Sequence, residues 1–151
     1  MSRRVVVTGL GCVTPLGNDV DGLWQAILAG RSGIRPLQLL DSSRHKVKFG
    51  GECVEFDPTV AVDRKEVNRL DRFVQFAMYG AMFAVRDSGL DFAAEDSYRC
   101  GAILGSGIGG LHEIEEQNQR LITKGPDRVS PFTIPKMMLN AAGGNVSIAY
   151  G

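Results

Sequence analysis

Two short apolar runs, each followed by glycine-containing turns, organise the pattern along the chain. Residues 4–8 are rich in valine, and residues 100–104 form an apolar run that leads into the glycine-rich segment 105–110. Continuous apolar runs of this length are typical of buried strands in a parallel sheet. We therefore predict a central strand at each place. Glycines after the second strand would let a ligand or substrate approach the backbone closely.

Helical periodicity accounts for much of the remaining chain. Apolar residues that recur at helical spacing predict helices over residues 18–30, 71–88, 111–124 and 136–150. Asn18 is the expected N-cap of the first helix, and Trp24 is an expected anchor in the core. Residues 129–135 contain two prolines and are expected to be extended.

The segment between the first two predicted helices is less regular. Residues 31–43 have no periodic pattern, whereas apolar and polar residues alternate over 47–53. This alternation predicts a short hairpin, or a bent edge strand, across the glycines at 50 and 51. Strands that alternate with helices in this order predict an α/β fold.

The glycine-rich segment also has the spacing of a dinucleotide-binding motif, because Gly105, Gly107 and Gly110 satisfy G-x-G-x-x-G. That motif needs a second strand ending in an acidic residue about 20 residues later. Asp127 lies near that distance, but the residues before it, 122–126, have no strand pattern. A nucleotide-binding domain therefore stays a distant alternative to a simple turn between a strand and its helix.

Composition narrows the classes of partner. The chain has 17 basic and 17 acidic residues, so no net charge attracts it to nucleic acid or to an anionic membrane. No apolar run approaches the length of about 20 residues that spans a bilayer. The three cysteines show no C-x-x-C spacing, which favours the reducing cytoplasm. Neither a metal motif nor a cofactor motif is evident, and we expect no cofactor.

The densest charge lies in residues 63–72. Lys65, Arg69 and Arg72 recur at helical spacing there, which favours a surface that docks an acidic partner. A solvated helix start is the alternative, because most charged runs are solvated.

Four segments together resemble the N-terminal part of the β-ketoacyl-acyl carrier protein synthases, specifically the elongating type II condensing enzymes. They are residues 3–18, 68–77, 105–110 and 124–151. The resemblance implies the thiolase-like fold, in which two similar α/β halves stack their sheets between helices as αβαβα layers. Residues 1–151 would form most of the first half and would stop before the helix that carries the cysteine nucleophile.

The resemblance also implies an activity. Members of the family elongate fatty acids by decarboxylative Claisen condensation of malonyl-carrier protein with an acyl-enzyme thioester. Implied partners are acyl carrier protein, the acyl and malonyl thioesters, and a second subunit in a homodimer. The alternatives are a polyketide ketosynthase or its chain-length partner and, from a different class, a non-catalytic binding or assembly module.

No catalytic residue is expected within 1–151, so the chain alone is predicted to be inactive. The family's nucleophile and its two histidines match none of the residues of those types in this sequence. These residues are Cys12, Cys53, Cys100, His45 and His112.

The acyl pocket and the docking surface, by contrast, fall inside the chain. By resemblance, Ile108 beside Gly107 is the gate of the pocket, and Thr133 departs from the usual Phe-Phe pair and is expected to reshape the channel. The expected pocket residues are Gly107, Ile108, Phe132, Thr133, Met137 and Met138. The expected docking residues for the acidic carrier protein are Lys65, Arg69 and Arg128.

Overall fold

The computed structural model describes residues 3–151, which fall into two compact units. The first unit contains the described residues up to Asp57 together with Met82–Gly89. The second contains Pro58–Ala81 and Leu90–Gly151. The candidate pocket and docking residues all belong to the second unit.

The first unit contains helix α1, a two-stranded sheet and the last part of helix α3 (Arg72–Ser88), from Met82 onward. Helix α1 spans Val20–Leu28, and its N-cap is Asp19, whose carboxylate accepts a 2.6 Å hydrogen bond from the Gly22 amide. The expectation of Asn18 as N-cap was wrong by one residue, and a carboxylate at this position is favoured by the helix dipole as well. Gly30, with φ of +65°, follows the helix end as expected.

Of the two forms expected for residues 47–53, the hairpin across residues 50 and 51 does not form, but a short edge strand does. Strand β2, Phe49–Gly50, instead pairs antiparallel with β1, Arg35–Pro36, which lies in the stretch expected to be irregular. The carboxylate of Glu52 accepts hydrogen bonds from the Gln38 and Leu39 amides. These bonds fasten the two segments together. They hold β2 in the register in which Arg35 pairs with Gly50 and Pro36 with Phe49.

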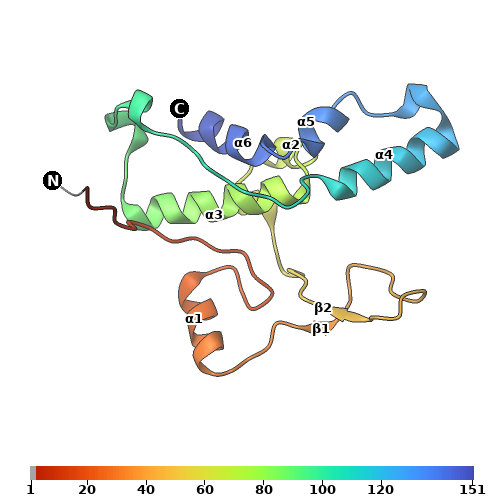
Figure 1. Ribbon diagram of the computed structural model, residues 1–151, viewed down its shortest axis with the longest axis horizontal. Coiled ribbons are helices and arrows are strands. Elements are labelled where there is room, and N and C mark those ends of the chain that lie inside the picture. The colour runs from red at the N-terminus through yellow and green to blue at the C-terminus, as the bar shows by residue number, and fades with distance from the viewer. Residues whose placement is uncertain (1–2) are drawn as a thin grey trace. The chain divides into compact units, whose positions relative to one another are not determined.

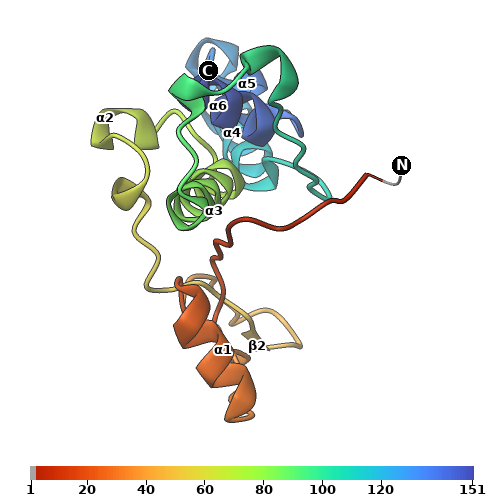
Figure 2. The same cartoon turned by 90° about the vertical axis from the view of Figure 1, so that its left-hand side faces the viewer.

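The second unit is built from helices. In addition to short 3₁₀ turns it contains α2 (Arg64–Val67), the first part of α3 (Arg72–Ser88), α4 (Leu111–Lys124), α5 (Thr133–Met137) and α6 (Ala141–Tyr150) (Figure 1). Helix α5 packs against both α4 and α6 and lies between them along the chain in Figure 1, and Figure 2 views the same helices end on. The structure confirms the predicted helices at 71–88 and 111–124, which end before glycines with positive φ, Gly89 and Gly125.

The prediction for the C-terminal region was partly wrong. Residues 136–150 do not form one helix, because the chain breaks between α5 and α6 at 138–140. Helix α5 already begins at Thr133, inside the segment expected to be extended. Pro135 is tolerated there because it lies in the first turn, where backbone amides have no partner within the helix.

The two predicted central strands are also absent. Residues 4–8 and 100–104 contain no strand, and Val5 is 92% exposed while Ile103 is fully exposed. A strand needs a neighbour to pair with its backbone groups. Within residues 3–151 the only pairings are β1 with β2 and a bridge between Thr14 and Gly17.

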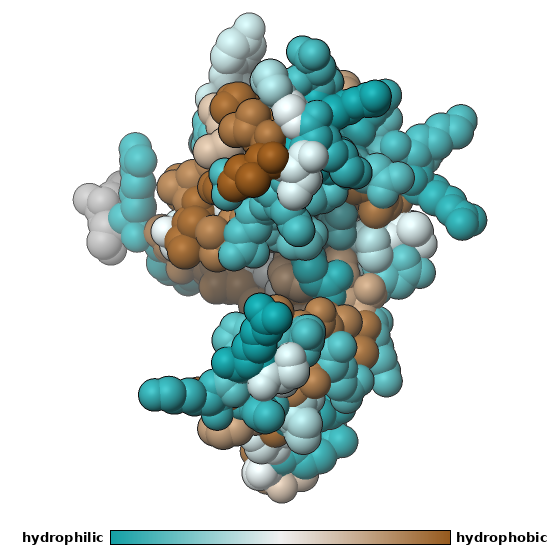
Figure 3. All heavy atoms as spheres, turned by 90° about the vertical axis from the view of Figure 1, so that its right-hand side faces the viewer, coloured by the Kyte–Doolittle hydropathy of each residue, from teal (hydrophilic) through white to brown (hydrophobic). Residues whose placement is uncertain are grey.

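The core is small, and polar residues take part in it. Val74 of α3 and Glu113 of α4 are the largest fully buried side chains among the described residues. Trp24 is 56% exposed, so its expected role as a core anchor was wrong. Hydrophobic side chains remain visible on the surface (Figure 3). Among residues 3–151, none of the helices combines the length and the apolar character needed to cross a membrane.

Candidate functional site

The glycine-rich turn closes directly against the end of α5. The Gly110 amide donates a 3.1 Å hydrogen bond to the Met137 carbonyl, and the Gly109 amide donates to Ser106 Oγ. Gly109 has φ of +91°, and a Cβ added there would lie 2.6 Å from the Met137 carbonyl oxygen. Only residues without side chains permit this approach.

The turn leaves the predicted gate residue without close packing. Ile108 is 64% exposed, and nothing lies within 4 Å of the position that a Cβ on Gly107 would occupy. Met137 is half-buried and Met138 is exposed. The Gly110–Met137 hydrogen bond therefore brings the segments of the predicted gate and the predicted pocket wall together, and both present apolar side chains at the surface.

Phe132 and Thr133 are held by a network centred on Ser130. Thr133 donates to the Ser130 carbonyl through both its amide and its hydroxyl, and the Phe132 amide donates to Ser130 Oγ. The Ser130 amide in turn donates a 2.9 Å bond to Oε1 of Gln117, which is buried on α4. The two candidate pocket residues are thus fixed relative to α4.

One docking residue contacts this network. The guanidinium of Arg69 lies 5.9 Å from the centre of the Phe132 ring and also pairs with Glu66 at 2.8 Å. Lys65 is exposed on α2, whose last residue is Val67. Lys65, Arg69 and Arg72 therefore do not share one helix face, and that part of the spacing argument was wrong.

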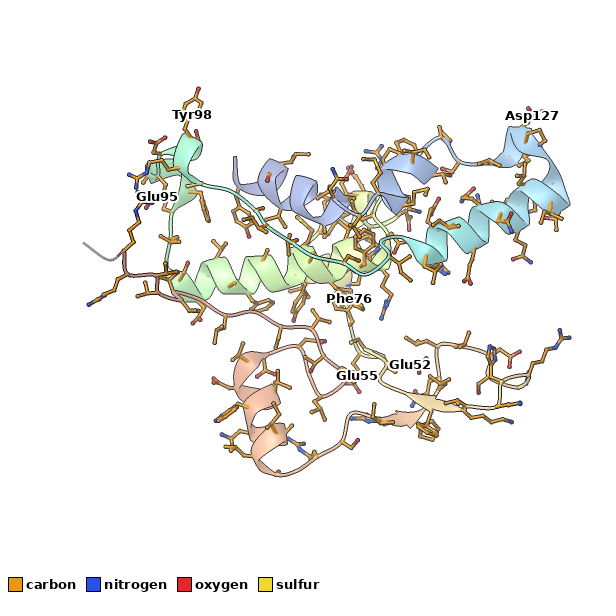
Figure 4. All side chains as sticks on the ribbon, in the orientation of Figure 1. Glu52, Glu55, Phe76, Glu95, Tyr98 and Asp127 are labelled. Carbon is orange, nitrogen blue, oxygen red and sulfur yellow. The ribbon has the colours of Figure 1, made fainter. Side chains whose placement is uncertain are left out.

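Arg128 lies in the turn after α4, at a surface hollow that is richer in cations than the sequence suggested. Its lining includes Arg120, Lys124, Asp127 and Ser130. Asp127 points outward from this turn in Figure 4, and Arg120 pairs with Glu116. The four-residue spacing of 120, 124 and 128 is the signal in the sequence that could have indicated this group of cations.

Beneath the turn lies a buried ionic cluster that sequence reasoning missed entirely. Glu113 is 1% exposed, and its Oε2 lies 2.5 Å from Lys136 Nζ. Its backbone amide donates to the carboxylate of Asp71, which is also buried. The cluster joins α3, α4 and α5.

The surroundings of Cys12 do not favour a role as a nucleophile. Burial raises the pKa of the Cys12 thiol, and the negative charge of Asp19 raises that pKa further, so the reactive thiolate is disfavoured. Cys53 is half-buried and Cys100 is exposed, and both His45 and His112 are exposed. Residues 3–151 contain no group of three acidic, cysteine or histidine side chains that could hold a metal ion.

The comparisons with known proteins identify the fold and then the family. The structure superimposes on a chain from a solved complex described as a type II PKS acyl-carrier protein with its ketosynthase bound to the hexaketide. The TM-score is 0.79 and the sequence identity 23%, and the match covers 99% of this chain and 39% of that chain. This confirms the predicted thiolase-like fold of the α/β class.

The family follows from the sequence match. Residues 2–151 match the N-terminal domain of beta-ketoacyl synthases, and the chain belongs to this family. It is 47% identical over 148 residues to 3-oxoacyl-[acyl-carrier-protein] synthase 2 of Coxiella burnetii, covering 98% of this chain and 36% of the relative. The corresponding Synechocystis protein is 44% identical over 149 residues, with 99% and 36% covered. The chain therefore spans about a third of the length of these relatives.

The dinucleotide alternative loses its structural basis. The motif requires a second strand before Asp127, but residues 111–124 form α4. The glycines instead serve the close approach of α5.

The first test concerns that approach. Replacing Gly110 by alanine would place a Cβ 2.7 Å from Met137 Cα and 2.9 Å from the Lys136 carbonyl oxygen. Because backbone atoms cannot move aside easily, we expect a loss of about 1–3 kcal/mol in the free energy of unfolding. The control is Gly105→Ala, where nothing lies within 4 Å. Denaturant unfolding of both variants measures the difference, and equal stability would contradict the described contact.

Proposed function

We propose that this chain is the N-terminal part of a synthase that elongates fatty acids on acyl carrier protein by decarboxylative condensation. The observation that carries the proposal is the identity of 41–47% along nearly the whole chain with proteins named 3-oxoacyl-[acyl-carrier-protein] synthase 2. The geometry of the site supports it, because an exposed isoleucine and a methionine segment meet at the glycine turn.

The reaction requires groups that residues 1–151 do not supply. In the proposed chemistry a cysteine thiolate accepts the acyl chain as a thioester. Loss of CO₂ from the malonyl thioester then gives an enolate, stabilised by two histidines, whose carbon attacks the acyl thioester and releases the cysteine. This chain contributes the gate at Ile108, with Gly107, and the pocket wall at Phe132, Thr133, Met137 and Met138.

The exposed apolar segments fit the same proposal. Residues 4–8 and 100–104 would pair with strands outside this chain, and the apolar surface of α1 would be covered in the complete, homodimeric enzyme. An unpaired apolar strand in water is unfavourable, because neither its backbone groups nor its side chains find partners. Three cysteines without C-x-x-C spacing suit a cytoplasmic location.

The fatty-acid pathway is preferred over the polyketide one. The relatives above 40% identity are named synthases of 3-oxoacyl carrier protein, whereas the polyketide ketosynthase is 23% identical. A chain-length partner would differ from a synthase in lacking the nucleophilic cysteine. The position of that cysteine would lie outside residues 1–151.

The direct test is an elongation assay on the complete synthase with acyl and malonyl carrier proteins. We expect release of CO₂ and a β-ketoacyl carrier longer by one two-carbon unit, and no product from residues 1–151 alone. Repeated extension without reduction would favour the polyketide alternative. Carrier binding without turnover would favour a non-catalytic module, and NAD binding would favour the nucleotide interpretation.

Carrier docking is tested by reversing charge at the rim. Lys65→Glu combined with Arg69→Glu in the complete synthase should weaken binding of the acidic carrier, mainly by slowing association. The effect should shrink as salt rises, because charges are screened within about 8 Å at physiological ionic strength. The matched control is Arg44→Glu with Lys46→Glu, an equal charge change at exposed positions of the first unit. Equal association rates for the two double variants at low salt would refute the docking surface.

The gate is tested by adding bulk at Ile108. Ile108→Phe in the complete synthase should lower kcat/KM for long acyl chains and spare short ones, with a penalty of about 1–3 kcal/mol for the overpacked channel. The control is Ile122→Phe, the same change at a 75% exposed position on α4. A constant ratio of long-chain to short-chain kcat/KM, together with a lower Tm, would mean that Ile108 is only a structural residue.

A further inference from the structure

Helix α4 buries the opposite set of residues from the one its sequence predicts. Its apolar residues Leu111, Leu121 and Ile122 are exposed, whereas Glu113 and Gln117 are buried. These two lie four residues apart and share one face of the helix. Gln117 accepts a hydrogen bond from the Ser130 amide, as described above, and Glu113 forms an ion pair with Lys136 of α5. The buried face of α4 therefore makes directional polar bonds to the segment that carries the candidate pocket residues.

The pair of Glu113 with Lys136 is poorly explained as a device for stability. Lys136 is 17% exposed at its side chain and Glu113 is 1% exposed, so both charges lose most of their hydration. Oε1 of Glu113 is buried and has no hydrogen-bond partner among the described residues. An apolar pair of similar volume is often as stable as a buried ion pair, and an unpaired buried oxygen adds a cost. What an ion pair provides better than an apolar pair is a fixed direction and length.

The fixed direction and length of this ion pair matter because of where the pair lies. Glu113 lies three residues after Gly110, at the start of α4, and Lys136 lies next to Met137. The Gly110 amide and the Met137 carbonyl are bonded to each other. The turn that carries Ile108 and the segment that carries Met137 and Met138 are therefore held by two parallel links, one of backbone and one of side chains.

Asp71, the residue directly before α3, completes the arrangement. Its Oδ2 accepts the Glu113 amide at 3.1 Å, and its Oδ1 accepts the Phe73 amide at the start of α3. The Asp71 carboxylate thus accepts amides from the first turns of both α3 and α4, where the helix dipoles favour a negative charge. Glu113 is thus fixed at both ends, because its backbone amide binds Asp71 and its carboxylate pairs with Lys136.

We infer that the Glu113–Lys136 pair is a positioning device that fixes the span between the Ile108 turn and the Met137–Met138 segment. In this way it limits the length of acyl chain that the pocket accepts. The inference rests on the proposed function, since it concerns the same pocket. Neither residue touches the acyl chain in this role; both act through the segments that they join.

The experiment compares the complete synthase with the variant Glu113→Gln/Lys136→Met, which removes both charges at nearly constant volume and leaves no lone buried charge. Amide hydrogen exchange at Gly110 should become about tenfold faster, because its bond to Met137 opens more often. Exchange at Leu23, bonded to Asp19 in the first unit, should not change. The ratio of kcat/KM for long and short acyl carriers should shift by about threefold or more. The control is Glu115→Gln/Lys46→Met, which makes the same changes at exposed positions.

Unchanged exchange at Gly110, or an unchanged ratio of long-chain to short-chain kcat/KM, would overturn the inference. If the neutral variant fails to fold, Lys136→Arg decides, because it keeps the charge and alters the length and shape of the link. A positioning role then requires a shifted chain-length ratio, whereas a role in charge balance alone leaves the ratio as it was. Exchange at Gly110 needs no turnover. A synthase that shows no condensation would therefore refute the proposed function, while the exchange measurement would still decide whether the pair holds the two segments together.

Discussion

The second unit depends on the close approach of two backbones where Gly109 and Gly110 meet residues 136–139. No side chain fits there, since a Cβ on either glycine would lie within 3 Å of backbone atoms. The approach sets the direction in which α4 leaves the turn and places α5 beside it. Once those two helices are adjacent, Glu113 faces Lys136, and Gln117 faces the amide of Ser130. The polar contacts of the site are consequences of a constraint that glycine alone satisfies.

The helices could be predicted from sequence because a helix satisfies its own backbone. Residues 71–88 and 111–124 show this, since the periodic pattern, the terminal glycines and the structure agree. Strands are different, because their backbone groups need another strand. The valine run at 4–8 predicts a buried strand, but these valines are exposed and no residue among 3–151 forms a strand pairing with them. The sequence pattern predicts which side chains a strand would bury. It does not predict which segment will pair with that strand.

The site was predictable only where its residues form a recognisable sequence pattern. The clustered glycines form one, and the resemblance supplied Ile108, Phe132 and the methionines. Glu113 does not stand out in the sequence, because an acidic residue in the first turn of a helix is the usual complement to the dipole. Nothing in the local sequence separates it from Glu115, which is exposed. The difference is tertiary: Glu113 lies on the side of α4 that α5 covers, and only the packing of the two helices shows this.

The contact of Arg69 with Phe132 links the predicted docking surface to the predicted pocket. Arg69 has two weak partners: an exposed cation–π contact is worth about 0.5–1 kcal/mol and an exposed pair such as that with Glu66 about 0–1 kcal/mol. An acidic partner at the surface could therefore draw the guanidinium away from both at little cost. Phe132 would then lose the group above its ring while keeping the bonds of its backbone to Ser130. The side chain of Phe132 would gain freedom although its backbone stays fixed. A single arginine in this position would thus let an acidic partner free the Phe132 side chain without any movement of a helix.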